Sequence, residues 1–165
     1  MNEGRLKLSK HFFVDEIYRT TVKDLEQTNR SQVGDNFNNA IDLAREVLDF
    51  ITDKTLDKFG ARPLITSWFR GPALNTRVGG SPRSQHCEAA AADFVLPIPE
   101  WGWQTAGDVM ELIAKLPHPY GQAIREINSH GSVWIHLSLA RGNLRYQLMD
   151  QKGGKYYIFE KTRTI

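Results

Sequence analysis

The sequence contains only one cysteine, Cys87, among its 165 residues. A single cysteine excludes an internal disulfide and is typical of a chain made in a reducing compartment. The sequence also lacks internal repeats, low-complexity tracts and recognisable linkers. Because its length suits one compact domain, we expect residues 1–165 to form a single folded unit.

Long hydrophobic runs and a strong net charge are missing as well. The opening segment, MNEGRLKLSKHFFVDEIYRTT, contains no apolar stretch of the length that a signal peptide or membrane span needs. We therefore expect no membrane insertion, and action outside the cytoplasm would require release by another route. The net charge of +2 is far below that of a typical nucleic-acid-binding protein, so no nucleic-acid partner is expected. The sequence does not indicate an oligomeric state.

The hydrophobic pattern predicts an α+β fold, with N-terminal helices packed on a mostly antiparallel sheet. Within the longest expected helix, Phe37, Ile41, Ala44 and Leu48 lie on one stripe. Gly60 is expected to end that helix. A later helix is expected to have Thr105 as its N-cap and to end at Pro117. Helices are predicted over residues 14–20, 36–59 and 105–117, strands over 62–69 and 91–97, a hairpin with arms 121–127 and 132–140, and a final hairpin over 144–161 that turns at Gly153-Gly154.

A long irregular loop is predicted over residues 70–86, RGPALNTRVGGSPRSQH, which is rich in Gly, Pro, Ser and Asn. Loops of this length in compact domains usually carry function. His86 closes the loop, and Asp93 lies on the strand that follows. Both residue types bind zinc, but seven residues of straight strand would separate their α-carbons by roughly 23 Å. They can share an ion only if the chain bends within the alanines at 89–92.

A third ligand is needed for a catalytic zinc site, and the segment VWIHLSL supplies a candidate, His136. Strict alternation along a strand would place Trp134, His136 and Ser138 on one face. Taken alone, this pattern is more typical of a core histidine that is hydrogen-bonded to a neighbour.

Several segments together resemble one known family. The stretch SQHCEAAAADF resembles the S-x-H-x-x-G-x-A-x-D motif of the zinc D-Ala-D-Ala carboxypeptidase family. That family shares its fold with the hedgehog signalling domain and includes phage endolysins that cut murein peptides. LSKHFFVDEI, ITSWFRGPALNTRVGG and WIHLSL are similar to the family's LSKHF…EF, ITSGYRSPALNRAVGG and WVHVSL segments, in the same order.

This resemblance implies a zinc cofactor held by His86, Asp93 and His136. It also implies that Arg70 contacts the substrate and that Ser84 lies near the metal. A planar guanidinium is well suited to a carboxylate because it donates two parallel hydrogen bonds. Without the neighbouring motifs, Arg70 would be read as a solvated loop residue and Ser84 as a turn residue.

The sequence departs from the family pattern at two points. Ala89 replaces the motif glycine, which costs on the order of 1 kcal/mol if the backbone there is left-handed. The family's catalytic carboxylate lies three or six residues before the last histidine, where this chain has Val133 and His130. GQAIRE resembles the family's DQLI-x-E, so we expect Glu126 to be the general base. The alternatives are that Glu126 is an exposed strand residue, or that His130 replaces it.

The resemblance favours a zinc-dependent metallopeptidase that hydrolyses peptidoglycan stem peptides. Both D-Ala-D-Ala carboxypeptidase and L-Ala-D-Glu endopeptidase activities occur in the family, and the sequence does not choose between them. We expect a phage or prophage lysin that is cytoplasmic at synthesis and acts at the cell wall after release, or is associated with the virion. The alternative is a catalytically inactive, hedgehog-like domain that binds zinc or serves as a virion structural part.

Overall fold

The chain folds as α+β, as expected, in a computed structural model that describes residues 4–165. The helical elements are η1 (Val14–Tyr18), η2 (Lys23–Leu25), α1 (Glu26–Ser31), α2 (Asn36–Leu43), η3 (Ala44–Leu48), α3 (Asp49–Phe59), α4 (Pro72–Arg77), η4 (Gln85–Glu88) and α5 (Trp103–Ala114). The strands are β1 (Leu64–Ser67), β2 (Ala91–Val95), β3 (Tyr120–Ile127), β4 (Val133–Leu139), β5 (Gln147–Lys152) and β6 (Lys155–Ile158). Across residues 4–165, no helix has the length and apolar character required to span a bilayer.

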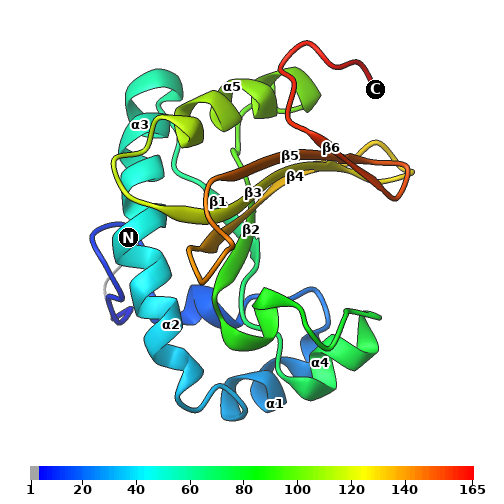
Figure 1. Cartoon of the computed structure of the whole chain (residues 1–165). Helices are drawn as coiled ribbons and strands as arrows, with labels where there is room; N and C mark the ends of the chain where they lie inside the picture. The colour runs from blue at the N-terminus through cyan, green and yellow to red at the C-terminus, as the bar shows by residue number, and fades with distance from the viewer. Residues whose placement is uncertain (1–3) are drawn as a thin grey trace.

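The six strands form one sheet in the order β1-β2-β4-β3-β5-β6 (Figure 1). Neighbouring strands are antiparallel except β3 and β5, which pair in parallel. The predicted hairpins are both present. Gly153 and Gly154 have φ values of 57° and 73°, the positive-φ pair that a tight two-residue hairpin turn requires. The parallel β3–β5 pairing was not anticipated, because adjacent hairpins alone suggest an antiparallel sheet throughout.

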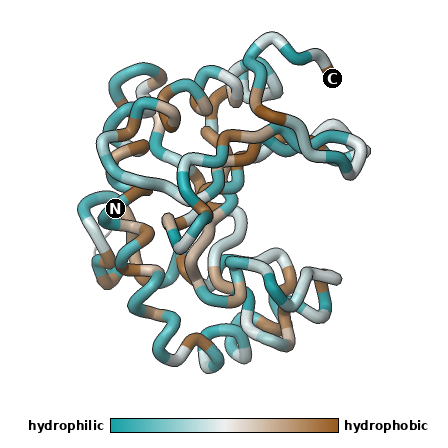
Figure 2. The backbone as a smooth tube through the Cα atoms, viewed as in Figure 1, coloured by the Kyte–Doolittle hydropathy of each residue, from teal (hydrophilic) through white to brown (hydrophobic). Residues whose placement is uncertain are grey.

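Elements α2, η3 and α3 run as one continuous helix, in which η3 is a π-helical segment. Gly60 ends this helix in a left-handed conformation, as the sequence predicted. Hydrophobic and hydrophilic residues alternate along the helix (Figure 2), and the buried ones include Ala44, Leu48 and Ile51. Helix α5 packs on β3 and β4 and also contacts α3. One face of the sheet is therefore covered by helices, which leaves the other face available for a site.

Two local predictions were wrong. The segment predicted to be an irregular loop contains helix α4, which starts with Pro72 at its first position, where the missing N–H and fixed φ are favourable. Helix α5 begins at Trp103 with Gly102 as its N-cap. Thr105 lies inside the first turn and donates its hydroxyl hydrogen to the Glu100 carbonyl at 2.6 Å, so it does not cap the helix.

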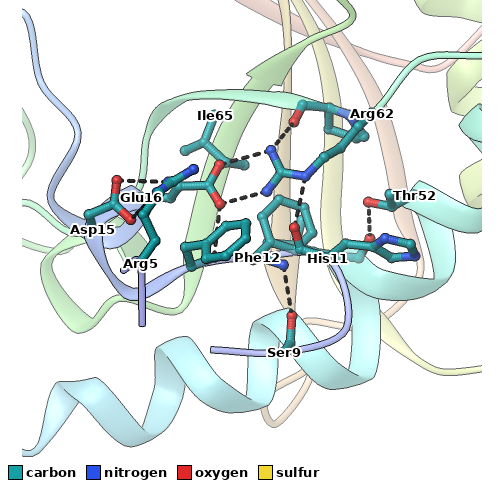
Figure 3. Close-up of polar contacts among 12 residues, drawn as sticks. Arg5, Ser9, His11, Phe12, Asp15, Glu16, Thr52, Arg62 and Ile65 are labelled. Carbon is teal, nitrogen blue, oxygen red and sulfur yellow. Dashed lines mark hydrogen bonds and ion pairs between the residues drawn. The ribbon is translucent and has the colours of Figure 1, made fainter. Parts of the chain in front are cut away.

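The N-terminal segment that resembles the family's LSKHF motif has a structural role (Figure 3). Arg62 donates to the His11 carbonyl at 2.8 Å and to Glu16 Oε1 at 2.9 Å. Glu16 is buried, and it also accepts the Phe13 backbone N–H. Asp49 on α3 accepts the Ser9 hydroxyl at 2.8 Å. These bonds hold the N-terminal segment against the start of β1 and the long helix.

Candidate active site

Two of the predicted ligands come from adjacent central strands. Asp93 on β2 lies directly opposite His136 on β4 in the antiparallel register. Side chains of directly opposed residues lie on the same face and close together. His136 Nδ1 is accordingly 3.0 Å from Asp93 Oδ1.

The third predicted ligand, His86, is brought back to Asp93 by a turn at Ala89. Ser84 caps η4 by accepting the His86 N–H, and Ala89 ends this element in the left-handed conformation, with φ 56° and ψ 19°. The Trp68 indole donates to the Ala89 carbonyl at 3.1 Å and holds the turn. The predicted bend is therefore present, and it occurs at the alanine that replaces the motif glycine. As a result, His86 Nε2 lies 3.1 Å from Asp93 Oδ1.

The outer nitrogens of both imidazoles are already engaged. His86 Nδ1 donates to the Trp68 carbonyl at 2.6 Å, and His136 Nε2 donates to Gln85 Oε1 at 2.9 Å. In neutral imidazoles, these bonds leave the lone pairs on His86 Nε2 and His136 Nδ1. Both lone pairs face the carboxylate of Asp93, which is also an acceptor. Three acceptors that converge in this way repel one another unless protons or a cation lie between them.

The cluster fits a zinc ion. The donor atoms of His86, Asp93 and His136 all lie within 4.8 Å of one another. In tetrahedral zinc sites with bonds near 2.0–2.1 Å, ligand atoms are about 3.3 Å apart, close to the distances found here. Burial opposes ionisation of Asp93, but the two histidines outweigh it and hold the pKa of this carboxyl well below its usual range. The structure brings the three residues together, while their binding of zinc stays a prediction.

Glu126 lies in the same cavity, which has a volume of about 400 Å³. On β3 it pairs with Trp134, two residues beyond the pair formed by Ile124 and His136, so that Glu126 and His136 project from the same face of the sheet. Burial and the charge of Asp93 raise the pKa of Glu126 to about 7, although His136 and Arg70 oppose the rise. A carboxylate with a pKa near neutral pH is suited to take up and release a proton.

Arg70 and Ser84 line this cavity too. Arg70 Nη2 donates to Ser84 Oγ at 3.2 Å, and the Arg70 backbone N–H donates to the His86 carbonyl. Within residues 4–165, the buried Nε of Arg70 has no hydrogen-bond partner. Because Arg70 also lines the cavity, its guanidinium group is placed where it can bind an anionic group of a ligand.

Several residues of the cavity were not identified from the sequence. Gln85 and the Trp68 carbonyl orient the two histidines, and Tyr156 lines the cavity from the distant strand β6. The adjacency of Gln85 to His86 was the only available signal, because the other contacts depend on the tertiary fold. His130, considered as an alternative base, is exposed in the β3–β4 turn and lies outside the set of described residues that line the cavity.

Comparison with known proteins adds one finding. The chain matches the family model described as Peptidase M15 over residues 10–130. A search of curated proteins gave no match. The matched range includes Arg70, His86, Asp93 and Glu126, whereas His136 lies beyond it. The family match therefore does not extend to His136, whose place in the cluster comes from the structure and was expected from the WIHLSL segment.

Proposed function

Because the chain belongs to the peptidase M15 family, we propose that it is a zinc-dependent peptidase that hydrolyses stem peptides of peptidoglycan. One observation carries the proposal: three side chains of types that bind zinc converge in a cavity that also contains a carboxylate with a raised pKa. His86 Nε2, His136 Nδ1 and the Asp93 carboxylate would hold the ion. Gln85 and the Trp68 carbonyl fix the histidine tautomers that this requires.

Zinc bound there supplies Lewis-acid chemistry, which polarises the scissile carbonyl and acidifies nearby water. Glu126 acts as the general base: its carboxylate accepts a proton from the attacking water and passes that proton to the leaving amine. In the metal-free protein the pKa of Glu126 is about 7, and the charge of a bound zinc ion would lower it, so that the ionised base is present at neutral pH.

Arg70 binds the substrate carboxylate that positions the scissile bond. In D-Ala-D-Ala and in L-Ala-D-Glu, the α-carbon attached to the scissile nitrogen carries a free carboxylate. A single arginine can therefore orient either substrate through its planar donor group. The proposal covers both bond types, and it includes a role as a phage or prophage lysin acting at the cell wall.

The experiment is digestion of purified peptidoglycan followed by mass spectrometry of the soluble products. We expect wild-type protein loaded with zinc to release either free D-alanine or peptide fragments of defined mass, and the Glu126→Gln variant to release neither above background. If the wild type binds one zinc per chain but leaves the peptidoglycan intact, the alternative of an inactive zinc-binding domain replaces the proposal. The masses of the fragments identify the bond that is cleaved.

A further inference from the structure

A row of side chains crosses the sheet from the cavity to the outer edge. Glu126 pairs with Trp134 on one side and with Gln151 on the other, and Gln151 pairs with Tyr156 on β6. Directly paired residues project from the same face of a sheet. Tyr156 therefore shares the face that carries the candidate zinc ligands, and it also lines the cavity.

Strands β5 and β6 extend this face beyond the cavity. Tyr156 is 59% exposed and Ile158 is 85% exposed, large values for side chains of this size. We call the surface the Tyr156 face, and its members are Gln147, Met149, Gln151, Tyr156 and Ile158. On the opposite face of β5, which lies toward α5 and the C-terminal segment (Figure 1), Asp150 is fully buried.

We propose that the Tyr156 face binds the glycan strand of peptidoglycan, an uncharged chain of N-acetylated amino sugars, while the attached peptide enters the cavity. This inference rests on the proposed function and adds a second contact with the same substrate. The aromatic ring of Tyr156 offers an apolar surface to the sugar rings, and the glutamine amides bond to hydroxyl and N-acetyl groups.

The distance between the two contacts requires a long substrate. Strands lie about 4.8 Å apart, so Tyr156 on β6 is roughly 14 Å across the sheet from β4, which carries His136. A dipeptide spans at most about 7 Å. A ligand that occupies both regions must therefore be larger than the two residues around the scissile bond.

The chemistry of the face favours glycan over additional peptide. All five side chains of the Tyr156 face are uncharged. The stem peptide carries carboxylates, which arginine or lysine side chains would bind. Arg70 and Arg83 line the cavity, whereas the Tyr156 face contains neither residue type. A neutral polymer loses no ionic hydration when it covers an uncharged surface, so the glycan is the better match for this part of the sheet.

The test compares two soluble substrates that share one stem peptide, of which only one carries a glycan tetrasaccharide. The measured quantity is the ratio of their kcat/KM values. We expect the wild type to prefer the glycan-linked substrate, and Tyr156→Ala to lower the ratio by about 10-fold through loss of the aromatic contact. The matched control is Tyr157→Ala, which alters the neighbouring residue on the opposite face and should preserve the ratio.

Binding of an N-acetylglucosamine tetramer, measured by calorimetry on the same three proteins, separates failure of this inference from failure of the proposed function. If neither substrate is cleaved but Tyr156→Ala weakens tetramer binding, the proposed function fails and the glycan face stands. If both substrates are cleaved with equal kcat/KM and the tetramer does not bind, the glycan face is overturned. A preference for longer glycan-free peptides would likewise overturn it and assign the face to peptide.

Discussion

Arg125 and Glu126 are neighbours on β3, yet they project from opposite faces of the sheet into different surroundings. Arg125 is fully buried and donates to both carboxylate oxygens of Asp150, at 2.8 and 3.1 Å. It also donates to the Trp103 carbonyl at 3.0 Å and stacks on the Trp103 ring. Glu126 instead faces the cavity, and its pKa is raised to about 7.

The difference separates a charge that stabilises the fold from a charge that is available for chemistry. Asp150 accepts further bonds from Arg163 at 3.0 Å and from the Glu160 N–H at 3.2 Å, so the charges on that face are balanced within the protein. On the cavity face, the donor atoms of Asp93 and the two histidines face one another, and Arg70 lines the same cavity. Such an arrangement leaves charged groups where a metal ion and an anionic ligand can bind them.

The largest expected effect is on stability, at the buried pair of Arg125 and Asp150. Arg125→Met should lower the free energy of unfolding by about 3–5 kcal/mol, because it leaves Asp150 buried without its main partner. Chemical denaturation measures this loss. The double variant Arg125→Met/Asp150→Leu is the control and should regain part of the stability. A loss below about 1 kcal/mol in the single variant would mean that Arg163 alone compensates the buried carboxylate.

On the cavity face, Glu126→Gln should reduce kcat on a soluble muropeptide by at least about 100-fold, as expected for removal of a general base. The variant should fold and bind zinc like the wild type, because the amide keeps the shape of the side chain. Circular dichroism and zinc titration check both points. Activity within a few-fold of the wild type would exclude Glu126 as the base.

The same carboxylate predicts a pH dependence of stability in the metal-free protein. The pKa of Glu126 is about 7 in the folded state, above its ordinary value of 4.5. Its contribution is therefore fully present below about pH 4.5 and is lost as the pH rises through 7, by no more than about 3 kcal/mol. Unfolding measured from pH 5 to 8 should show this decline in the wild type and a weaker decline in Glu126→Gln. Identical slopes would contradict the assigned pKa.

A smaller effect is expected at Gln85, which accepts the His136 Nε2 hydrogen. Gln85→Ala should weaken zinc binding by about 10- to 100-fold, the usual effect of losing a partner that orients a ligand. Competition with a chelator measures the affinity. Gln85→Glu keeps the acceptor and should retain more of the affinity than Gln85→Ala does. Equal losses in both variants would show that the hydrogen bond does not orient His136.

The sequence predicted the parts of the fold that local patterns determine. The amphipathic helix ending at Gly60 and the hairpin turn at Gly153-Gly154 follow from periodicity and from backbone freedom at glycine. The parallel pairing of β3 with β5 could not be predicted in this way, because it depends on contacts between residues distant in the sequence. Helix α4 was missed because Gly and Pro around a short helix also suggest a loop.

For the site, the motifs named the candidate ligands, the candidate base and the arginine, but not the residues that orient the ligands or complete the lining of the cavity. His86, Asp93, His136, Glu126 and Arg70 were all expected, and the structure brings them to one cavity. Their supporting contacts involve a backbone carbonyl, an indole and an amide, which are common groups that carry no motif of their own. Only the tertiary structure shows which of them meet the site.

The central claim is that His86, Asp93 and His136 hold one zinc ion beside Glu126. Anomalous diffraction at the zinc absorption edge, from crystals grown with zinc, tests it most directly. We predict a single strong peak about 2.0–2.1 Å from His86 Nε2 and His136 Nδ1, with the Asp93 carboxylate as the third protein ligand. A peak elsewhere in the molecule, or none at this cluster, would contradict the claim.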